Sequence, residues 1–157
     1  RRSLHLLHSW SCTVTPLSLE QANRIIEQTI ASAHEMKLPP IGVAVLDSGG
    51  HLKALQIEDG LAFLRIRVCH AKAWGSLGLG VDSAKLGERY LQGGMNPGFI
   101  GALNAMCDGQ AVPLPGGVLI HDAEGQIIGA VGVSGAAPED DEKCAKAGLN
   151  AAGWNVT

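Results

Sequence analysis

Aromatic side chains are scarce in this chain of 157 residues, where phenylalanine, tyrosine and tryptophan together make up 4% of the sequence although 46% of it is hydrophobic. The length and the apolar content are enough for the core of one domain. Because large rings are few and 21 residues are glycine, we expect a core of small side chains in close backbone contact. A large ligand or a subunit interface would supply the missing bulk.

Clusters of basic residues and long hydrophobic runs are missing as well. The formal net charge is −3, and no stripe of Lys and Arg is present, so we expect neither nucleic acid nor an anionic membrane surface as the main partner. No stretch approaches the roughly 20 apolar residues of a membrane span. The expected partners are therefore small molecules and other copies of the chain.

Paired cysteines and a nucleophile motif are also lacking. The four cysteines form no CxxC pair, which argues against a zinc ribbon and against covalent haem attachment through CxxCH. The segment GVSGA at 132–136 differs from the GxSxG elbow of serine hydrolases, so we interpret Ser134 as a loop hydroxyl. The cysteines, interpreted as buried or unreactive thiols, are Cys12, Cys69, Cys107 and Cys144.

Helix and strand patterns follow one another along the chain. Ser18 and Gln21 form a capping-box pattern ahead of a helix that ends near Lys37. Apolar runs at 41–46 and 51–57 flank DSGG and predict a hairpin with its turn at 47–50. Further patterns predict helices over 61–77, 83–91 and 99–107, a second hairpin around DAEG within 113–135, and a last helix from Pro138.

Five segments, taken in order, resemble the GlcG/HbpS-like family of small haem-binding proteins, which also supplies the C-terminal domain of PduO-type corrinoid adenosyltransferases. The resemblance covers roughly Leu17 to Gly153. The segments are LSLEQANRIIEQTIASAHEM, IGVAVLDSGGHLKAL, CHAKAW, PLPGGVLIHDAEGQIIGAVGVSG and PEDDEKCAKAGL.

The resemblance and the order of elements predict an α+β fold. We expect a profilin-like antiparallel sheet of about five strands flanked by helices in α/β/α layers, with one strand within Gly109–Leu114. Residues 17–157 are expected to form a single domain, and residues 1–16 a disordered or artificially added arm. The family's symmetric assemblies imply a homo-oligomer. We expect a cytoplasmic protein, with export left open because the sequence begins with Arg1 and some family members are exported.

The resemblance implies haem or a related tetrapyrrole as the ligand, with a corrinoid as the second choice. Histidine is the usual proximal ligand of haem iron, and the chain has six. The axial ligand differs among family members, so no motif transfers it. We rank His51, in the family-like GGHL segment, first as the iron ligand and His70 second.

Anion-binding groups complete the predicted site. Arg65 and Lys72 are candidates to bind haem propionates or a substrate carboxylate. Backbone N–H groups around Gly116, Gly117 and Ser134 are candidates to hold a carboxylate or a phosphate. The acidic run Glu139 to Asp141 suits either a cation or the N-terminus of a helix, and the helix dipole alone explains it.

Three functions stay open at this point. The first is an oligomeric haem- or tetrapyrrole-binding protein that sequesters, carries or senses its ligand. The second is a small enzyme acting on an organic acid in a catabolic pathway, with His51 and Lys72 as acid and base and Arg65 as the anion clamp. The third is a non-catalytic assembly or sensory module. The run EDGLAFLRIRVCHAKAW departs from the family pattern by its large residues before the lysine, so a reshaped pocket is expected.

Overall fold

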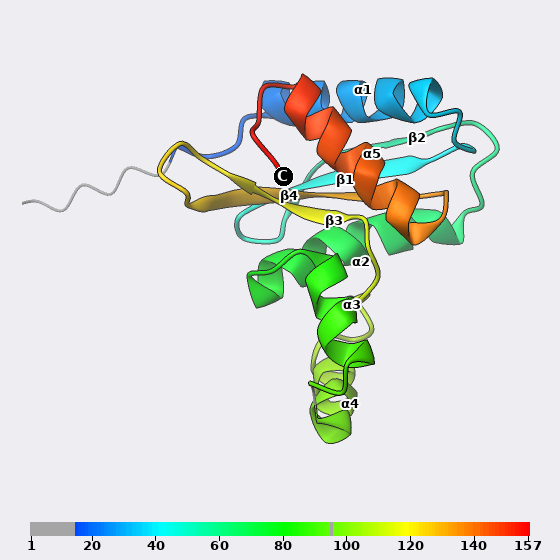
Figure 1. Cartoon of the computed structure of the whole chain (residues 1–157). Helices are drawn as coiled ribbons and strands as arrows, with labels where there is room; N and C mark the ends of the chain where they lie inside the picture. The colour runs from blue at the N-terminus through cyan, green and yellow to red at the C-terminus, as the bar shows by residue number, and fades with distance from the viewer. Residues whose placement is uncertain (1–14, 95) are drawn as a thin grey trace, which may run out of the picture.

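A computed structural model describes residues 15–94 and 96–157, and Figure 1 shows a sheet between two layers of helices. Helices α1 and α5 cover one face of the sheet, and α2 covers the other. None of the described helices is both long and apolar enough to cross a membrane. The elements are α1 (Leu19–Glu35), β1 (Gly42–Asp47), β2 (Leu52–Ile57), α2 (Leu64–Leu79), α3 (Ser83–Leu91), α4 (Pro97–Met106), β3 (Gly117–His121), β4 (Ile127–Ser134) and α5 (Pro138–Ala151).

The first helix begins as the capping-box pattern predicts. The Gln21 N–H donates to Ser18 Oγ at 3.1 Å, and the Ser18 N–H donates to Gln21 Oε1 at 2.9 Å. These two bonds satisfy N–H groups that the first turn of a helix otherwise leaves unpaired. The buried face of α1 then packs on the sheet through residues such as Ile25 and Ile26.

The sheet is antiparallel throughout, in the order β2-β1-β4-β3. Its two hairpins meet through the central strands β1 and β4, which are almost wholly buried. Because successive side chains alternate between the faces of a strand, Val43 and Val45 join the core under α1 and α5. Ala44 and Leu46 join a smaller core under α2.

Helices lie on their neighbours at backbone contact, as the shortage of large side chains suggested. A Cβ atom at Gly132 in β4 would lie 1.9 Å from the Cys69 carbonyl oxygen of α2. A Cβ atom at Gly148 in α5 would lie 2.1 Å from Thr29 Oγ1 of α1. Both distances are far below van der Waals contact, so only glycine permits these approaches.

Helices α3 and α4 form an arm (residues 83–94 and 96–106) that extends away from the three layers, with α4 at its far end (Figure 1). The α4 sequence, PGFIGALNAM, contains no charged residue. Leu103 is buried, whereas Phe99 and Met106 are 48% and 76% exposed. The arm therefore presents apolar surface that no described part of this chain covers.

The α+β prediction, with an antiparallel sheet between helical layers, is confirmed, but the expectation of about five strands is wrong by one among the described residues. The segment Gly109–Leu114 forms no strand and packs instead against helices: Ala111 lies against Gly75 of α2, and Pro113 against Gly87 of α3. The N-terminal segment 1–16, expected to be disordered or artificially added, lies outside the described residues except for residues 15 and 16.

Candidate functional site

Helix α2 carries apolar residues on more than one side. Cys69 and Ala73 face the sheet and are buried, while Leu64 points elsewhere and is 56% exposed. A helix covered on one side normally shows a polar outer face. The outer apolar residues of α2 therefore mark a surface suited to a ligand or a partner.

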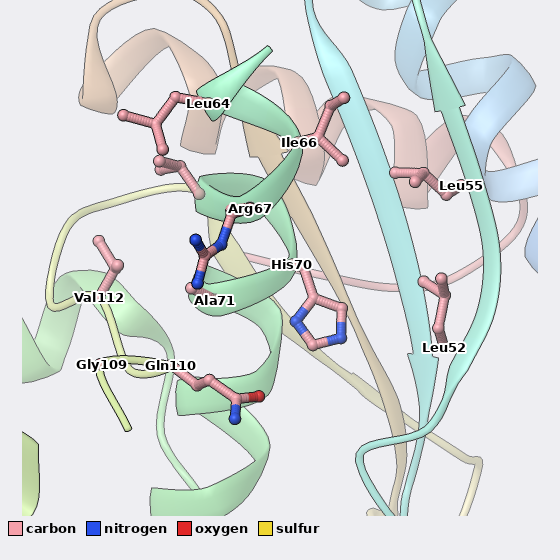
Figure 2. Close-up of a pocket in the computed structure, with 11 residues that line it drawn as sticks. Leu52, Leu55, Leu64, Ile66, Arg67, His70, Ala71, Gly109, Gln110 and Val112 are labelled. Atoms are coloured by element: carbon pink, nitrogen blue, oxygen red, sulfur yellow. The ribbon is translucent and has the colours of Figure 1, made fainter. Parts of the chain in front are cut away.

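A largely apolar cavity of about 400 Å³ lies along this outer surface, bounded by β2 on one side and by the chain that returns from α4 on the other (Figure 2). Its size falls within the range of small-molecule and cofactor sites, roughly 300–1,000 Å³. The apolar lining comprises Leu52, Leu55, Leu64, Ile66, Val68 and Val112.

The polar groups in the cavity come chiefly from two positions of α2, Arg67 and His70, which are three residues apart and so share one helix face. Figure 2 shows the Arg67 guanidinium and the His70 imidazole over adjoining turns of the helix, with the Gln110 amide beside them. An arginine at the edge of an apolar cavity favours a ligand with an apolar body and an anionic group.

The imidazole of His70 is partly buried and has no hydrogen-bond partner among the described residues. Burial lowers the pKa of His70 from its ordinary value of 6.5, because desolvation disfavours the charged ring. The ring is therefore neutral at neutral pH, which is the form that binds metals.

His51, ranked first from the sequence, lies outside this cavity. It follows the β1–β2 turn, its side chain is 81% exposed, and its Nδ1 lies 3.1 Å from Asp47 Oδ1. Burial acts to raise the pKa of Asp47, but N–H groups of His51 and Gly49 that donate to it, together with the His51 ring, leave that pKa below its usual value. The geometry thus gives His51 a place in the hydrogen bonds of the turn, and it favours His70 as the histidine of the cavity.

The other five predicted site residues converge on a second place, between α2 and the start of α5. Lys72 is only 1% exposed, and its Nζ donates to Asp141 Oδ2 at 2.8 Å and to the Val133 carbonyl at 3.0 Å. A Cβ atom at Gly116 would lie 2.8 Å from the same Nζ. The Arg65 guanidinium donates to Ser134 Oγ at 3.4 Å.

This cluster is closed rather than open to a ligand. The Gly117 N–H, a predicted anion-binding group, donates to Ser83 Oγ at 2.8 Å. The second carboxylate oxygen of Asp141 accepts the Ala136 N–H at 2.9 Å. Burial raises the pKa of Asp141 and lowers the pKa of Lys72, since desolvation outweighs their mutual attraction. The pair fastens α2 to the N-terminus of α5.

The acidic run at the start of α5 is divided by this arrangement, since Asp141 is fully buried against Lys72 while Glu139 is exposed. Across residues 15–94 and 96–157, no three His, Cys, Asp or Glu side chains converge where they would hold a metal ion. The run therefore acts, in the described structure, as the favourable first turn of a helix.

A family model described as "Haem degrading protein HbpS-like" matches residues 17–150. The chain belongs to the HbpS-like family. A comparison with curated proteins finds no match.

Solved structures of similar fold agree with this membership. The crystal structure of the Klebsiella pneumoniae protein ORFY is 25% identical, with a TM-score of 0.80 over 93% of this chain and 97% of that one. The crystal structure of HbpS is 24% identical, with a TM-score of 0.73 over 88% and 91% of the two chains. The crystal structure of a PduOC:heme complex is 20% identical, with a TM-score of 0.79 over 90% and 98%.

Two residues that matter in this HbpS-like structure were missing from the predicted site. Arg67 lines the cavity, and its spacing of three from His70 on one helix was a usable signal. Asp141 was noticed only as part of an acidic run, because nothing in the sequence links it to Lys72, 69 residues earlier.

Proposed function

We propose that this protein is a homo-oligomer that binds haem, or a related tetrapyrrole, in the cavity along α2, and that it sequesters, carries or senses this ligand. The observation that carries the proposal is an apolar cavity containing the neutral imidazole of His70, which has no hydrogen-bond partner within residues 15–94 and 96–157. Two comparisons support it: the family description names haem, and a protein of similar fold was crystallised with heme. A corrinoid is the second choice of ligand.

The residues of the cavity fit haem by their chemistry. A ring nitrogen of His70 would ligate the iron, Arg67 would bind a propionate, and the leucine and valine side chains would lie on the porphyrin face. Bound haem would supply a redox-active iron. The chain itself orients the ligand, keeps the imidazole neutral and excludes water from one porphyrin face.

An organic-acid enzyme finds less support in the geometry. That function needs His51, Lys72 and Arg65 around one substrate, whereas Lys72 is buried against Asp141 and His51 is on the β1–β2 turn with its ring exposed. Arg65 bonds to Ser134 at the closed cluster. We therefore propose no catalytic reaction.

Haemin titration tests the proposal. Wild-type protein, His70→Ala and His51→Ala are titrated with haemin and followed by Soret absorbance, and His51→Ala is the matched control because it removes an exposed imidazole. We expect a saturable, shifted band at one haemin per subunit or per dimer in the wild type. The band should be lost or moved in His70→Ala and unchanged in His51→Ala.

The titration has two adverse outcomes. A non-saturable response of the wild type, equal to that of an unrelated protein of similar pI, would remove haem from consideration. A band that is lost in His51→Ala and kept in His70→Ala would identify His51, in the β1–β2 turn, as the iron ligand and would refute the assignment of the cavity.

A further inference from the structure

Exposed hydrophobic side chains gather around the arm and the start of α2. Of the eleven large hydrophobic residues that are exposed in the described structure, four lie on the arm: Tyr90, Leu91, Phe99 and Met106, here called the arm patch. Another three, Leu52, Phe63 and Leu64, here called the α2 patch, lie at or beside the cavity. Helix α1, on the opposite face of the sheet, has Leu19 as its only exposed large hydrophobic residue within its described length.

Helix α4 needs a covering surface. It has ten residues, and isolated helices shorter than about 12–15 residues are marginal in water even with favourable sequences. Its only buried residue is Leu103. The arm points away from its own sheet (Figure 1), so the α2 patch of the same chain is not the surface that covers it.

The α2 patch has the properties that α4 requires of a partner surface. Because α4 carries no charge, it can lie on an apolar surface without burying an unpaired ion. The charged residue of the cavity lining, Arg67, is exposed and can remain in water. A charged partner protein would have to bury its own ions on either patch.

The area is also sufficient for a stable contact. The seven side chains of the two patches are between 48% and 85% exposed. If each loses about 100 Å² on association, one subunit buries about 700 Å², which is close to the roughly 800 Å² per partner of a standard interface. A two-fold axis would cover both patches on both copies.

We propose that the arm patch packs on the α2 patch of a second copy of this chain, and that the arm of each subunit thereby closes the cavity of the other. Phe99 and Met106 then become part of the wall of the partner's cavity. The contact between copies stands without any ligand, whereas the role of the arm as a cavity wall rests on the proposed function.

Sedimentation velocity in the absence of haemin tests the contact. The double variant Phe99→Glu/Met106→Glu places charges on exposed positions of the arm, and Leu19→Glu is the matched control on the exposed side of α1. We expect wild type and control to sediment as a dimer or larger over a dilution series and the double variant to sediment as a monomer. Far-UV circular dichroism should show that Leu19→Glu keeps the helix content of the wild type and that the double variant loses no more helix than the ten residues of α4.

Either of two results would overturn the proposal: a wild type that is monomeric over the whole series, or a double variant that assembles like the wild type. The first would leave the patches to a different partner. The second would place the interface elsewhere.

Directed cross-linking tests which surfaces meet. Met106→Cys and Leu64→Cys are introduced into separate chains of different size, in a background with Cys12→Ser and Cys107→Ser, and the mixture is oxidised. We expect a disulfide between the two unlike chains, and much less when Leu19→Cys replaces Met106→Cys. Equal yields from both mixtures would contradict the contact, and this readout is unaffected by the outcome of any haemin titration.

Discussion

The chemistry of the cavity depends on where one imidazole lies. His70 is on a helix that packs against the sheet, so its ring is partly withdrawn from water and its pKa is lowered by desolvation. His51 is on a turn, where water surrounds most of the ring and Asp47 accepts its hydrogen bond. The two residues have the same functional group, but of the two only His70 has its ring directed to an apolar space (Figure 2).

The lowered pKa of His70 gives a prediction about pH. As the pH falls through 6.5, an ordinary histidine is half protonated, but we expect His70 to remain mostly neutral. In the same range the unfolded chain binds a proton that folded His70 does not, so this residue lowers the free energy of unfolding as the pH drops below 6.5. Histidine ring shifts, recorded by NMR between about pH 5 and 8, measure the titration, with His70→Ala for assignment. A midpoint at or above 6.5 would contradict the burial of the ring.

The sequence could locate part of the site but could not tell which part is open. Five of its seven candidates do lie together, because the family-like segments around Lys72, Gly116 and Ser134 meet in the fold. Whether a lysine is free to bind a ligand or is buried in an ion pair depends on residues far along the chain. Here the carboxylate of Asp141 pairs with Lys72. Arg67 was not among the site candidates, although its spacing from His70 places both residues on one helix face, because which face of α2 borders a cavity follows from how that helix lies on the sheet.

At the scale of secondary-structure elements, glycine sets the distance between layers. The Cys69 carbonyl oxygen of α2 lies 1.9 Å from the position that a Cβ atom at Gly132 of β4 would take. A side chain there has backbone as its neighbour, and backbone cannot move aside without shifting the whole helix. The packing of α2 on the sheet, and with it the wall of the cavity, therefore depends on this residue.

We expect Gly132→Ala to lower the free energy of unfolding by about 1–3 kcal/mol, the usual cost of overpacking a core. The control is Gly78→Ala in α2, where no atom of another described helix, strand or loop lies within 4 Å of an added Cβ. That change should raise the free energy of unfolding by about 0.5–1 kcal/mol, because alanine is the better helix former. Urea denaturation of both variants measures the difference. Equal midpoints for wild type and Gly132→Ala would mean that the helix does not approach the strand as described.

Most helices and strands could be predicted because caps, turn residues and apolar periodicity are set by residues close together in the sequence. The helix at 83–91 has the expected bounds, and Gly50 has a φ of 79° in the predicted DSGG turn. The fifth strand failed because pairing is not local. The outer edge of β3 is already occupied, since the Gly117 and Leu119 N–H groups donate to Ser83 Oγ and Asp82 Oδ1 at the start of α3. Pro113 also lacks the N–H that a strand would need.

At the scale of the whole molecule, the two faces of the sheet differ in how completely they are covered. Two long helices, α1 and α5, pack on one face and on each other, and their core includes the largest buried side chains after Lys72. Within residues 15–94 and 96–157, the core under the other face is covered by α2 alone, with smaller side chains beneath it and the cavity beyond it. A second subunit and a flat ligand would cover the same uncovered side, so assembly and ligand binding are expected to depend on each other.

This dependence gives a prediction that rests on both proposals. If the arm of one subunit closes the cavity of the other, haemin should bind the dimer more tightly than the monomer, and saturating haemin should lower the protein concentration at which the dimer dissociates. Typical coupling between two sites corresponds to about 5- to 150-fold. Dilution series with and without haemin, followed by sedimentation velocity, measure the shift.

Linkage makes the effect reciprocal, so the monomeric variant Phe99→Glu/Met106→Glu should bind haemin more weakly by a similar factor. Its Soret band should keep the wild-type position, because His70 is untouched and the iron ligand is the same. A band that moves would place Phe99 or Met106 close to the iron in the partner's cavity, rather than in a part of its wall remote from the iron. A dissociation midpoint that does not change with haemin would show that the copies meet without closing the cavity, and the arm would then serve assembly alone.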